Sequence, residues 1–177
     1  MLITPGNYRA RRLVRIFFLF ICLLPGVMVA GSTNREAETM KESILENEIR
    51  QEVEELHAFF VAWYNGNLPD RAFDDEFVAR LGTEFTIIMP SGIELDYDTL
   101  SSAMRQSFGK KPGFRIEIRN VRLIDATETT AIASYEEWQH MENEGAESSR
   151  GRVSTVVFSR EDRFKWLHVH ETWLPEE

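Results

Sequence analysis

Apolar residues recur at steps of three and four between residues 43 and 63 of the chain. Glutamates fill many of the positions between them, so a helix here would have one apolar and one acidic face. The pattern predicts a long amphipathic helix that ends at the turn-forming residues 65–67. Its apolar face would consist of Leu45, Ile49, Val53, Leu56, Phe60 and Trp63.

Two shorter helices and a strand are predicted next. Residues 70–81 place an apolar residue at every fourth position, which predicts a second helix with Gly82 as its C-terminal stop. Residues 85–89 form a short apolar run that predicts a strand. Asp96 is a residue type that caps helix N-termini, so a third helix would begin there and stop at Gly109.

From residue 114 onward the pattern changes to the two-residue alternation of strands. Short polar segments separate four such stretches, as in a series of antiparallel hairpins. The alternation slips by one residue at Arg119 and Asn120, which predicts a β-bulge that bends the first of these strands. The four predicted strands are residues 114–125, 130–141, 150–160 and 164–173.

This order of elements, with its bulged strand, resembles the nuclear transport factor 2-like superfamily, which includes SnoaL-like and ketosteroid-isomerase-like proteins. The closest local likeness is to the association domain of calcium/calmodulin-dependent protein kinase II and its small bacterial relatives. Three motifs carry it: AWYNGN at 62–67, FTIIMPSG at 85–92 and KWLHVH at 165–170. The resemblance implies a cystatin-like α+β fold, in which a cone-shaped, curved antiparallel sheet wraps round a long N-terminal helix.

The start of the chain has the pattern of a secretory signal. Four arginines precede an apolar run at 16–24, Pro25 interrupts the run, and small residues follow near Ala30. The run is shorter than the ~20 residues of a membrane-spanning helix, which favours export over a permanent anchor. The pair Arg11 and Arg12 leaves a twin-arginine signal open as an alternative.

Charge and cysteine content fit an exported domain that does not bind nucleic acid. The chain has 20 Lys and Arg against 29 Asp and Glu, a net charge of −9, and loss of the four signal arginines leaves 16 against 29, or −13. Such a surface repels nucleic acid and anionic lipid, so we expect neither partner after signal cleavage. Cys22 is the single cysteine and lies in the signal, so the mature domain would have no disulfide.

These features divide the chain into three parts. We expect a signal peptide at 1–31, a flexible polar lead-in at 32–42 and a SnoaL-like α+β domain at 43–175. The mature protein would be periplasmic or secreted.

In a cone-shaped fold the long helix and the concave sheet face enclose a cavity, and strand alternation decides which residues reach it. Alignment with the kinase association domain places Ile132, Ser134, Glu136, Trp138 and His140 inside, with Arg152, Ser154, Val156 and Phe158, and with Val169, Glu171 and Trp173. The predicted binding residues are Trp63, Glu136, Trp138, His140, Arg152, Glu171 and Trp173.

This alignment changes the ligand that the resemblance implies. The kinase domain lines its pocket with arginines that can hold a carboxylate, whereas Glu136, Val156 and Trp173 stand at those positions here. Two carboxylates in a low-dielectric cleft oppose added negative charge. A neutral or cationic small hydrophobic ligand is therefore expected in preference to a carboxylate.

Two functions from different classes fit these residues. The favoured one is an exported small-molecule-binding or oligomerisation module without chemistry. The alternative is a cofactor-free isomerase, dehydratase or hydrolase that uses Glu136 or Glu171 as general base on a small hydrophobic substrate. Exposure at the cavity mouth, or pairing with Arg152, would remove that role. An unpaired buried carboxylate would favour the enzyme, and no catalytic residue is assigned.

The histidines predict an interface rather than a metal site. His168 and His170 share one strand face, but no third ligand is identifiable, and His57 on the first helix has no evident partner. The sequence also has no phosphate-binding loop or nucleophile elbow, so we expect neither metal nor cofactor. The outer sheet face would pack against a second subunit to form a homodimer. Its predicted residues are Tyr135, Glu137, Trp166, His168 and His170.

Export generates the first testable prediction. Because signal peptidase removes the basic and apolar segments together, the mature protein should lack the residues up to about Ala30 or Gly31. Intact-mass measurement of the protein purified from its native host tests this expectation. Retention of residues 1–24 in a membrane fraction would contradict it.

Overall fold

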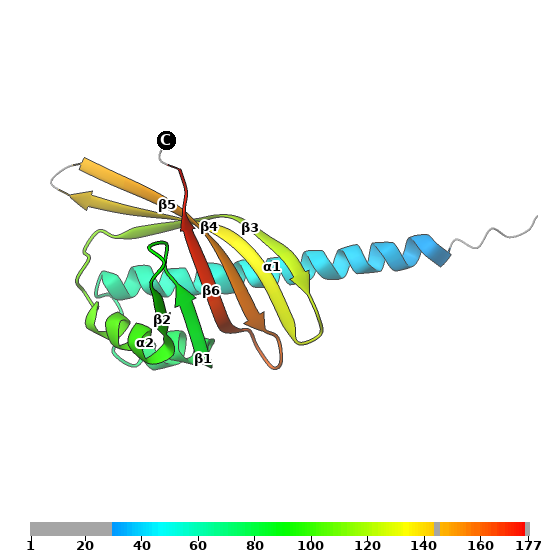
Figure 1. The fold of residues 1–177 in the computed structure, drawn as a ribbon, viewed down its shortest axis with the longest axis horizontal. Helices are drawn as coiled ribbons and strands as arrows, with labels where there is room; N and C mark the ends of the chain where they lie inside the picture. Colours follow the sequence, from blue (N-terminus) through cyan, green and yellow to red (C-terminus); the bar gives the residue numbers. More distant parts are fainter. Residues whose placement is uncertain (1–29, 144–145, 176–177) are drawn as a thin grey trace, which may run out of the picture.

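Residues 30–143 and 146–175 are described by a computed structural model of the chain (Figure 1). The predicted signal lies outside these residues except at its last two positions. Within them, a long helix α1 (Ala30–Tyr64) is followed by a π-helical turn (Phe73–Phe77) and a 3₁₀ turn (Val78–Arg80). The later elements are β1 (Leu81–Ile88), β2 (Glu94–Asp96), α2 (Tyr97–Gln106), β3 (Arg115–Ala126), β4 (Thr130–Asn143), β5 (Ala146–Ser159) and β6 (Lys165–Trp173).

The strands of the described residues form one curved sheet in the order β2-β1-β6-β5-β4-β3. Neighbouring strands are antiparallel except for β1 and β6, which run parallel. Figure 1 shows α1 crossing one face of this sheet and its N-terminal part continuing beyond the sheet edge. The predicted α+β fold, a curved and mainly antiparallel sheet packed on a long helix, is confirmed.

The bulge predicted in the first long strand is present in β3. The β3–β4 register shifts between Arg119 and Arg122, and Asn120 has a positive φ of 52°. Asparagine tolerates this left-handed conformation better than most residues do. Beyond the bend, β3 lies against α1, where Arg50 donates to the Val121 carbonyl and Glu46 accepts from the backbone N–H of Leu123. The bulge therefore keeps the sheet in contact with the helix.

The apolar face predicted for the first helix forms the core. Five of its six residues are buried, and Phe59 is buried in place of Phe60, which is partly exposed. Phe59 stacks on Trp63 and on Phe77, with ring centroids 5.6 and 5.7 Å apart. The indole N–H of Trp63 donates to the Met104 carbonyl at 2.7 Å and so joins α1 to α2.

The helix begins earlier than the sequence pattern predicted. Residues 32–42, expected as a flexible lead-in, belong to α1, which starts at Ala30 rather than at residue 43. No element of the described residues covers this part of the helix, and positions 34–44 are exposed. An apolar period is absent there because these residues do not pack on the sheet. Extending an existing helix by a turn requires far less free energy than nucleating a new one, so α1 can continue through these residues without packing contacts.

The prediction for residues 70–81 was wrong in its helix type and its end. The two short helical turns occupy this segment, and Leu81 already belongs to β1. Gly82 is a strand residue rather than a helix stop, and a Cβ there would lie 2.9 Å from the Leu167 side chain. Phe73 and Phe77 are buried as expected, so the spacing identified the packed face but not the helix.

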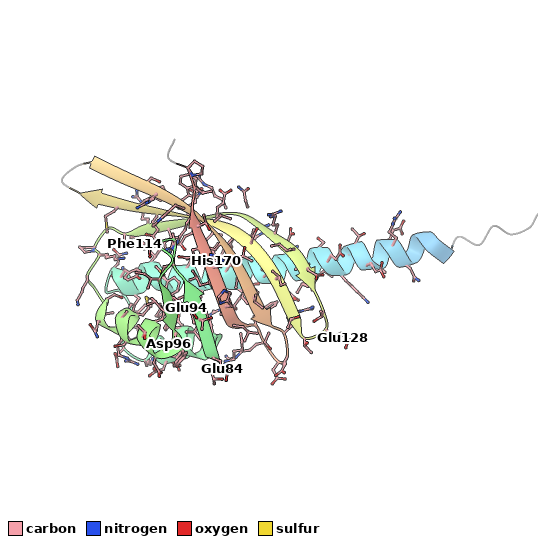
Figure 2. All side chains as sticks on the ribbon, viewed as in Figure 1. Glu84, Glu94, Asp96, Phe114, Glu128 and His170 are labelled. Carbon is pink, nitrogen blue, oxygen red and sulfur yellow. The ribbon has the colours of Figure 1, made fainter. Side chains whose placement is uncertain are left out.

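The third predicted helix is confirmed as α2. The Asp96 carboxylate accepts from the backbone N–H of Thr99 at 2.8 Å, which is the predicted N-cap (Figure 2). Gly109 follows the helix with a φ of 66°, a conformation that favours glycine. The three-residue strand β2, which pairs with β1, was not predicted because it is too short to show alternation.

Candidate functional site: a cavity between the helices and the sheet

A cavity of about 290 Å³ lies between α1, α2 and the concave face of the sheet. Most of its lining is apolar and comes from both helices and from β1, β4 and β6. A volume of this size suits a small organic molecule. The apolar lining includes Leu56 and Phe60 of α1, Leu100 and Met104 of α2, Ile87 of β1, and Trp166 and Val169 of β6.

Four ionisable side chains form a network in the cavity wall. The Arg152 guanidinium lies between two carboxylates: its Nε and Nη2 donate to Glu137 at 3.1 and 2.6 Å, and its Nη1 donates to Glu171 at 2.9 Å. The fourth member is His57 of α1, whose Nε2 lies 3.2 Å from Glu137 Oε2. Strand pairing sets this geometry, because Glu137 on β4 and Arg152 on β5 are directly opposed.

Glu137 is fully engaged as an acceptor. Besides the two bonds from Arg152, it accepts from Gln139 Nε2 at 2.7 Å and from His57, and its side chain is only 2% exposed. Burial alone would raise the pKa of Glu137. The hydrogen bond and charge of His57 and the charge of Arg152 outweigh burial and hold the pKa well below its usual range. Glu137 is therefore an ionised structural acceptor.

Both ring nitrogens of His57 lie against hydrogen-bond acceptors. Its Nδ1 lies 2.7 Å from the Val53 carbonyl, which can only accept a hydrogen bond. Its Nε2 faces a carboxylate, which also accepts. His57 therefore joins α1 to the cavity wall through Glu137. Arg152 in turn joins Glu137 to Glu171, so the four side chains form one continuous network.

Glu171 differs from Glu137 because one of its oxygens is available. Oε2 accepts from Arg152, whereas Oε1 has no hydrogen bond to any described residue, and Glu171 lines the cavity. Burial raises the pKa of the Glu171 carboxyl to about 7, although the charge of Arg152 opposes the shift. At neutral pH this group can therefore offer a bound molecule either a donor or an acceptor.

Three of the seven predicted binding residues line the cavity. Arg152, Glu171 and Trp173 do so, as the alternation of β5 and β6 indicated. Trp63 does not, because its ring is packed in the core behind the cavity wall.

The predicted inner face of β4 was wrong, so Glu136, Trp138 and His140 lie on the opposite face of the sheet. Glu136 accepts there from Asn120 at 2.9 Å and from the indole of Trp138 at 3.2 Å, and these bonds lower its pKa. Trp138 also lies under the Arg119 guanidinium, 4.8 Å away. A shift of one residue turns every side chain of a strand to the other face.

The residues of β4 that face the cavity are therefore ones that the sequence predicted on the outer face or assigned to neither face. Tyr135 and Glu137 are buried and line the cavity, and so does Trp166 of β6, all three of which were predicted on the outer face. Hairpin geometry could have revealed the correct register. Asn143 pairs with Ala146, and counting back along the hairpin from that pair places Glu137 opposite Arg152.

The histidines also divide between the two faces. His168 and His170 lie on the outer face as predicted, and His168 Nδ1 is 2.8 Å from Thr86 Oγ1. His57, for which the sequence suggested no partner, is 3% exposed and belongs to the charged network of the cavity wall. The sequence did not indicate this role because His57 stands among glutamates, which suggests a solvent-exposed helix face. In the structure this part of the helix packs against a polar part of the cavity wall.

Neither a membrane-spanning helix nor a metal site is found among the described residues. Across 30–143 and 146–175, no helix is long and apolar enough to cross a membrane. In the same residues, no three His, Cys, Asp or Glu side chains are grouped so that they could hold a metal ion.

Known structures with the same fold include proteins of several functions. A nuclear transport factor 2-like protein of unknown function from Pseudomonas aeruginosa is 31% identical, with a TM-score of 0.66 over 72% of this chain and 99% of that one. The association domain of Caenorhabditis elegans calcium/calmodulin-dependent protein kinase II is 15% identical, with a TM-score of 0.62 over 75% and 98%. A protein titled putative scytalone dehydratase from Novosphingobium aromaticivorans is 10% identical, with a TM-score of 0.60 over 77% and 89%. The superfamily suggested by the sequence is confirmed.

Relatives at the sequence level identify a family within that superfamily. Sucrose-phosphatases 1 and 2 of Nicotiana tabacum are 26% and 25% identical to the chain over 153 residues, which is 81% of this chain and 35% of each relative. The chain thus spans about a third of the length of these relatives. The profile named "Sucrose-6-phosphate phosphohydrolase C-terminal" matches residues 49–175. On this match, the chain belongs to the sucrose-6-phosphate phosphohydrolase C-terminal family.

Proposed function

We propose that the chain is an exported protein that binds a small, largely apolar molecule in the cavity between α1, α2 and the sheet. The observation that carries the proposal is the cavity itself: apolar walls surround about 290 Å³, and Arg152 pairs with both carboxylates of the wall, Glu137 and Glu171. A ligand therefore needs no charge of its own to enter the interior. Shape and apolar contact would supply most of the affinity.

Binding without chemistry agrees better with the carboxylates than catalysis does. A general base needs an available oxygen and a substrate within hydrogen-bond reach. Four hydrogen bonds occupy both oxygens of Glu137. Glu171 keeps Oε1 available, but Arg152 pairs with this carboxylate through Oε2. Neither carboxylate is the unpaired buried group that would favour an isomerase, dehydratase or hydrolase.

Export and family membership set the context of the proposal. The basic and apolar pattern of the first 31 residues supports export of the domain. The phosphatase activity in the names of the tobacco relatives is not proposed for this chain, because the chain aligns with only about a third of their length.

We also propose that two copies pair through the outer sheet face. That face carries half-buried apolar side chains, Ile132, Val153 and Val157, beside the exposed His170. Apolar side chains on a solvent-facing sheet favour burial against a second copy. The fold shared with a kinase association domain supports assembly of this kind.

Ligand binding is tested with a neutral probe that fits the cavity. We expect 1-adamantaneethanol to change the fluorescence of Trp166 and Trp173, because both indoles line the cavity. The substitution Ile87→Phe adds volume to the lining and should weaken binding at least about tenfold, a loss of roughly 1.4 kcal/mol. Fluorescence titration measures both affinities.

A matched substitution controls for general effects of the added ring. Ile93 is 59% exposed and does not line the cavity, so Ile93→Phe should bind the probe as the unmodified protein does. Equal binding by all three proteins, or no binding by any of them, would refute the cavity as the ligand site.

The titration of Glu171 generates a stability prediction. Its pKa is raised from 4.5 to about 7 in the folded protein, so its contribution to stability is complete below pH 4.5 and is lost as the pH rises through 7. Between pH 4.5 and 8, the unfolding free energy of the unmodified protein should fall relative to that of Glu171→Gln by about 3 kcal/mol. Urea denaturation at a series of pH values measures the difference.

Glu136→Gln is the control for this series. The pKa of Glu136 is lowered by its hydrogen bonds, so its effect on stability falls at more acidic pH. Parallel stability curves for Glu171→Gln and the unmodified protein across pH 4.5–8 would contradict the raised pKa.

Assembly is tested by mass in solution. Light scattering at micromolar concentration should give twice the monomer mass, and His170→Asp together with Val157→Asp should shift the mass toward the monomer. The introduced charges would face each other across a two-fold interface and oppose its formation. A monomer at every concentration would show that the face is not an interface between copies.

A further inference from the structure

A second pocket borders the cavity where β4 and β5 extend beyond the helices. Lys111 and Gln139 line both spaces, so the two are neighbours at those side chains. We call this space the outer pocket. Its lining consists of Lys111, Phe114, Gln139, His140, Met141, Ser149 and Arg150.

Two cations of the outer pocket rest on aromatic rings rather than on carboxylates. The Lys111 ammonium lies 4.1 Å from the ring centre of Tyr64 and 5.0 Å from that of Phe114, which lies just before β3 (Figure 2). The Arg150 guanidinium lies 3.6 Å from the ring centre of Trp173. Tyr64 and Trp173 line the cavity, so both cations stand at its border.

Neither cation has an ion-pair partner among the side chains that the structure describes. Arg80, Arg105, Arg119 and Arg152 each contact a carboxylate within 3 Å. Lys111, by contrast, is half-buried with two aromatic contacts only. Burial, and then the charge of Arg152, lower the pKa of Lys111. Placing an anion beside it would offset the cost of that burial.

The described carboxylates of the cavity wall, and Glu117 of β3, are already paired with arginines. Glu137 and Glu171 bind Arg152 in the cavity wall. Glu117 of β3 accepts two hydrogen bonds from Arg119, at 2.8 and 2.6 Å. The positive charge at the border is therefore not neutralised by any side chain in the described part of the chain, and it is free to attract a charged group of a ligand.

The interior and the border favour different parts of one molecule. Inside the cavity an anion would meet Glu137 and Glu171, and every guanidinium nitrogen of Arg152 already donates to one of them. At the border an anion would meet two cations. We propose that the ligand is an amphipathic carboxylate, whose apolar body fills the cavity and whose carboxylate lies in the outer pocket between Lys111 and Arg150.

This inference rests on the proposed function and changes what the sequence alone suggested. The sequence disfavoured a carboxylate because the kinase-type pocket arginines have no counterparts in the alignment. The structure places cations at other positions, outside the apolar space rather than within it. The anionic group is therefore held at the border while the interior stays uncharged.

A matched pair of probes separates the carboxylate from the apolar body. 1-Adamantaneacetate and 1-adamantaneethanol share one body and differ at the terminal group. At pH 7.5 and low salt we expect the acetate to bind at least about tenfold more tightly than the alcohol. Lys111→Gln and Arg150→Gln should each weaken acetate binding about fivefold, as expected for a partly exposed charge pair. Arg150 does not line the cavity, so Arg150→Gln should leave alcohol binding within about twofold.

The controls use a neighbouring cation and salt. Lys110 is exposed and lines neither pocket, so Lys110→Gln should leave both affinities unchanged. Raising the salt concentration should weaken acetate binding but not alcohol binding. Unchanged alcohol affinity in the Lys110 and Arg150 variants also confirms that these variants are folded.

The outcomes distinguish this inference from the proposed function. The carboxylate subsite is refuted if the alcohol binds and the acetate binds no more tightly. It is also refuted if the acetate keeps its higher affinity in both the Lys111 and Arg150 variants. In either case the apolar cavity remains supported as the binding site. If neither probe binds, the proposed function fails, and the inference fails with it.

Discussion

The interior of this protein depends on one arginine held between two glutamates. Arg152 engages Glu137 with two nitrogens and Glu171 with a third, and His57 Nε2 also lies against Glu137. A charge buried without a partner costs several kcal/mol, so removal of any member would leave the others uncompensated. Mutual compensation is what allows an ionised network to border an apolar cavity. It also explains why the two carboxylates differ, since Glu137 takes four hydrogen bonds and Glu171 keeps one oxygen available.

The backbone places these side chains through two constraints. Antiparallel pairing puts Glu137 directly opposite Arg152 and puts Glu171 two residues before Trp173, the partner of Arg152 on β6. The bulge at Asn120 bends β3 onto α1, so that the helix can present His57 to the sheet at the level of Glu137. A flat sheet would leave the helix side chain without its partner. Curvature therefore creates both the cavity and the network in its wall.

The sequence predicted the features that depend on periodicity and missed those that depend on strand pairing. The apolar face of α1 and the slip at Asn120 were readable because burial on one side imposes a period. The face of β4 was not, because Ala131, Ala133 and Tyr135 alternate with residues that are equally compatible with a core. The side chains of β4 form two alternating sets, one on each face of the sheet. Only the pairing of β4 with β5 decides which set faces the core. The extension of α1 to Ala30 was missed for a different reason: a helix without a packed face shows no apolar period.

The separation of charge between interior and border has a consequence for selectivity. An apolar molecule without a charge gains only the contacts of the cavity, and an anion without an apolar body gains only partly exposed cations, which bind weakly alone. A molecule that carries both groups at the right spacing makes the apolar contacts and the charge contacts together. It loses translational and rotational entropy only once, whereas two separate molecules would each lose it. The stacked positions of Lys111 and Arg150 limit their motion before binding, which lowers the entropy lost when an anion arrives. Specificity would then depend on the distance between the apolar body and the charge rather than on either group alone.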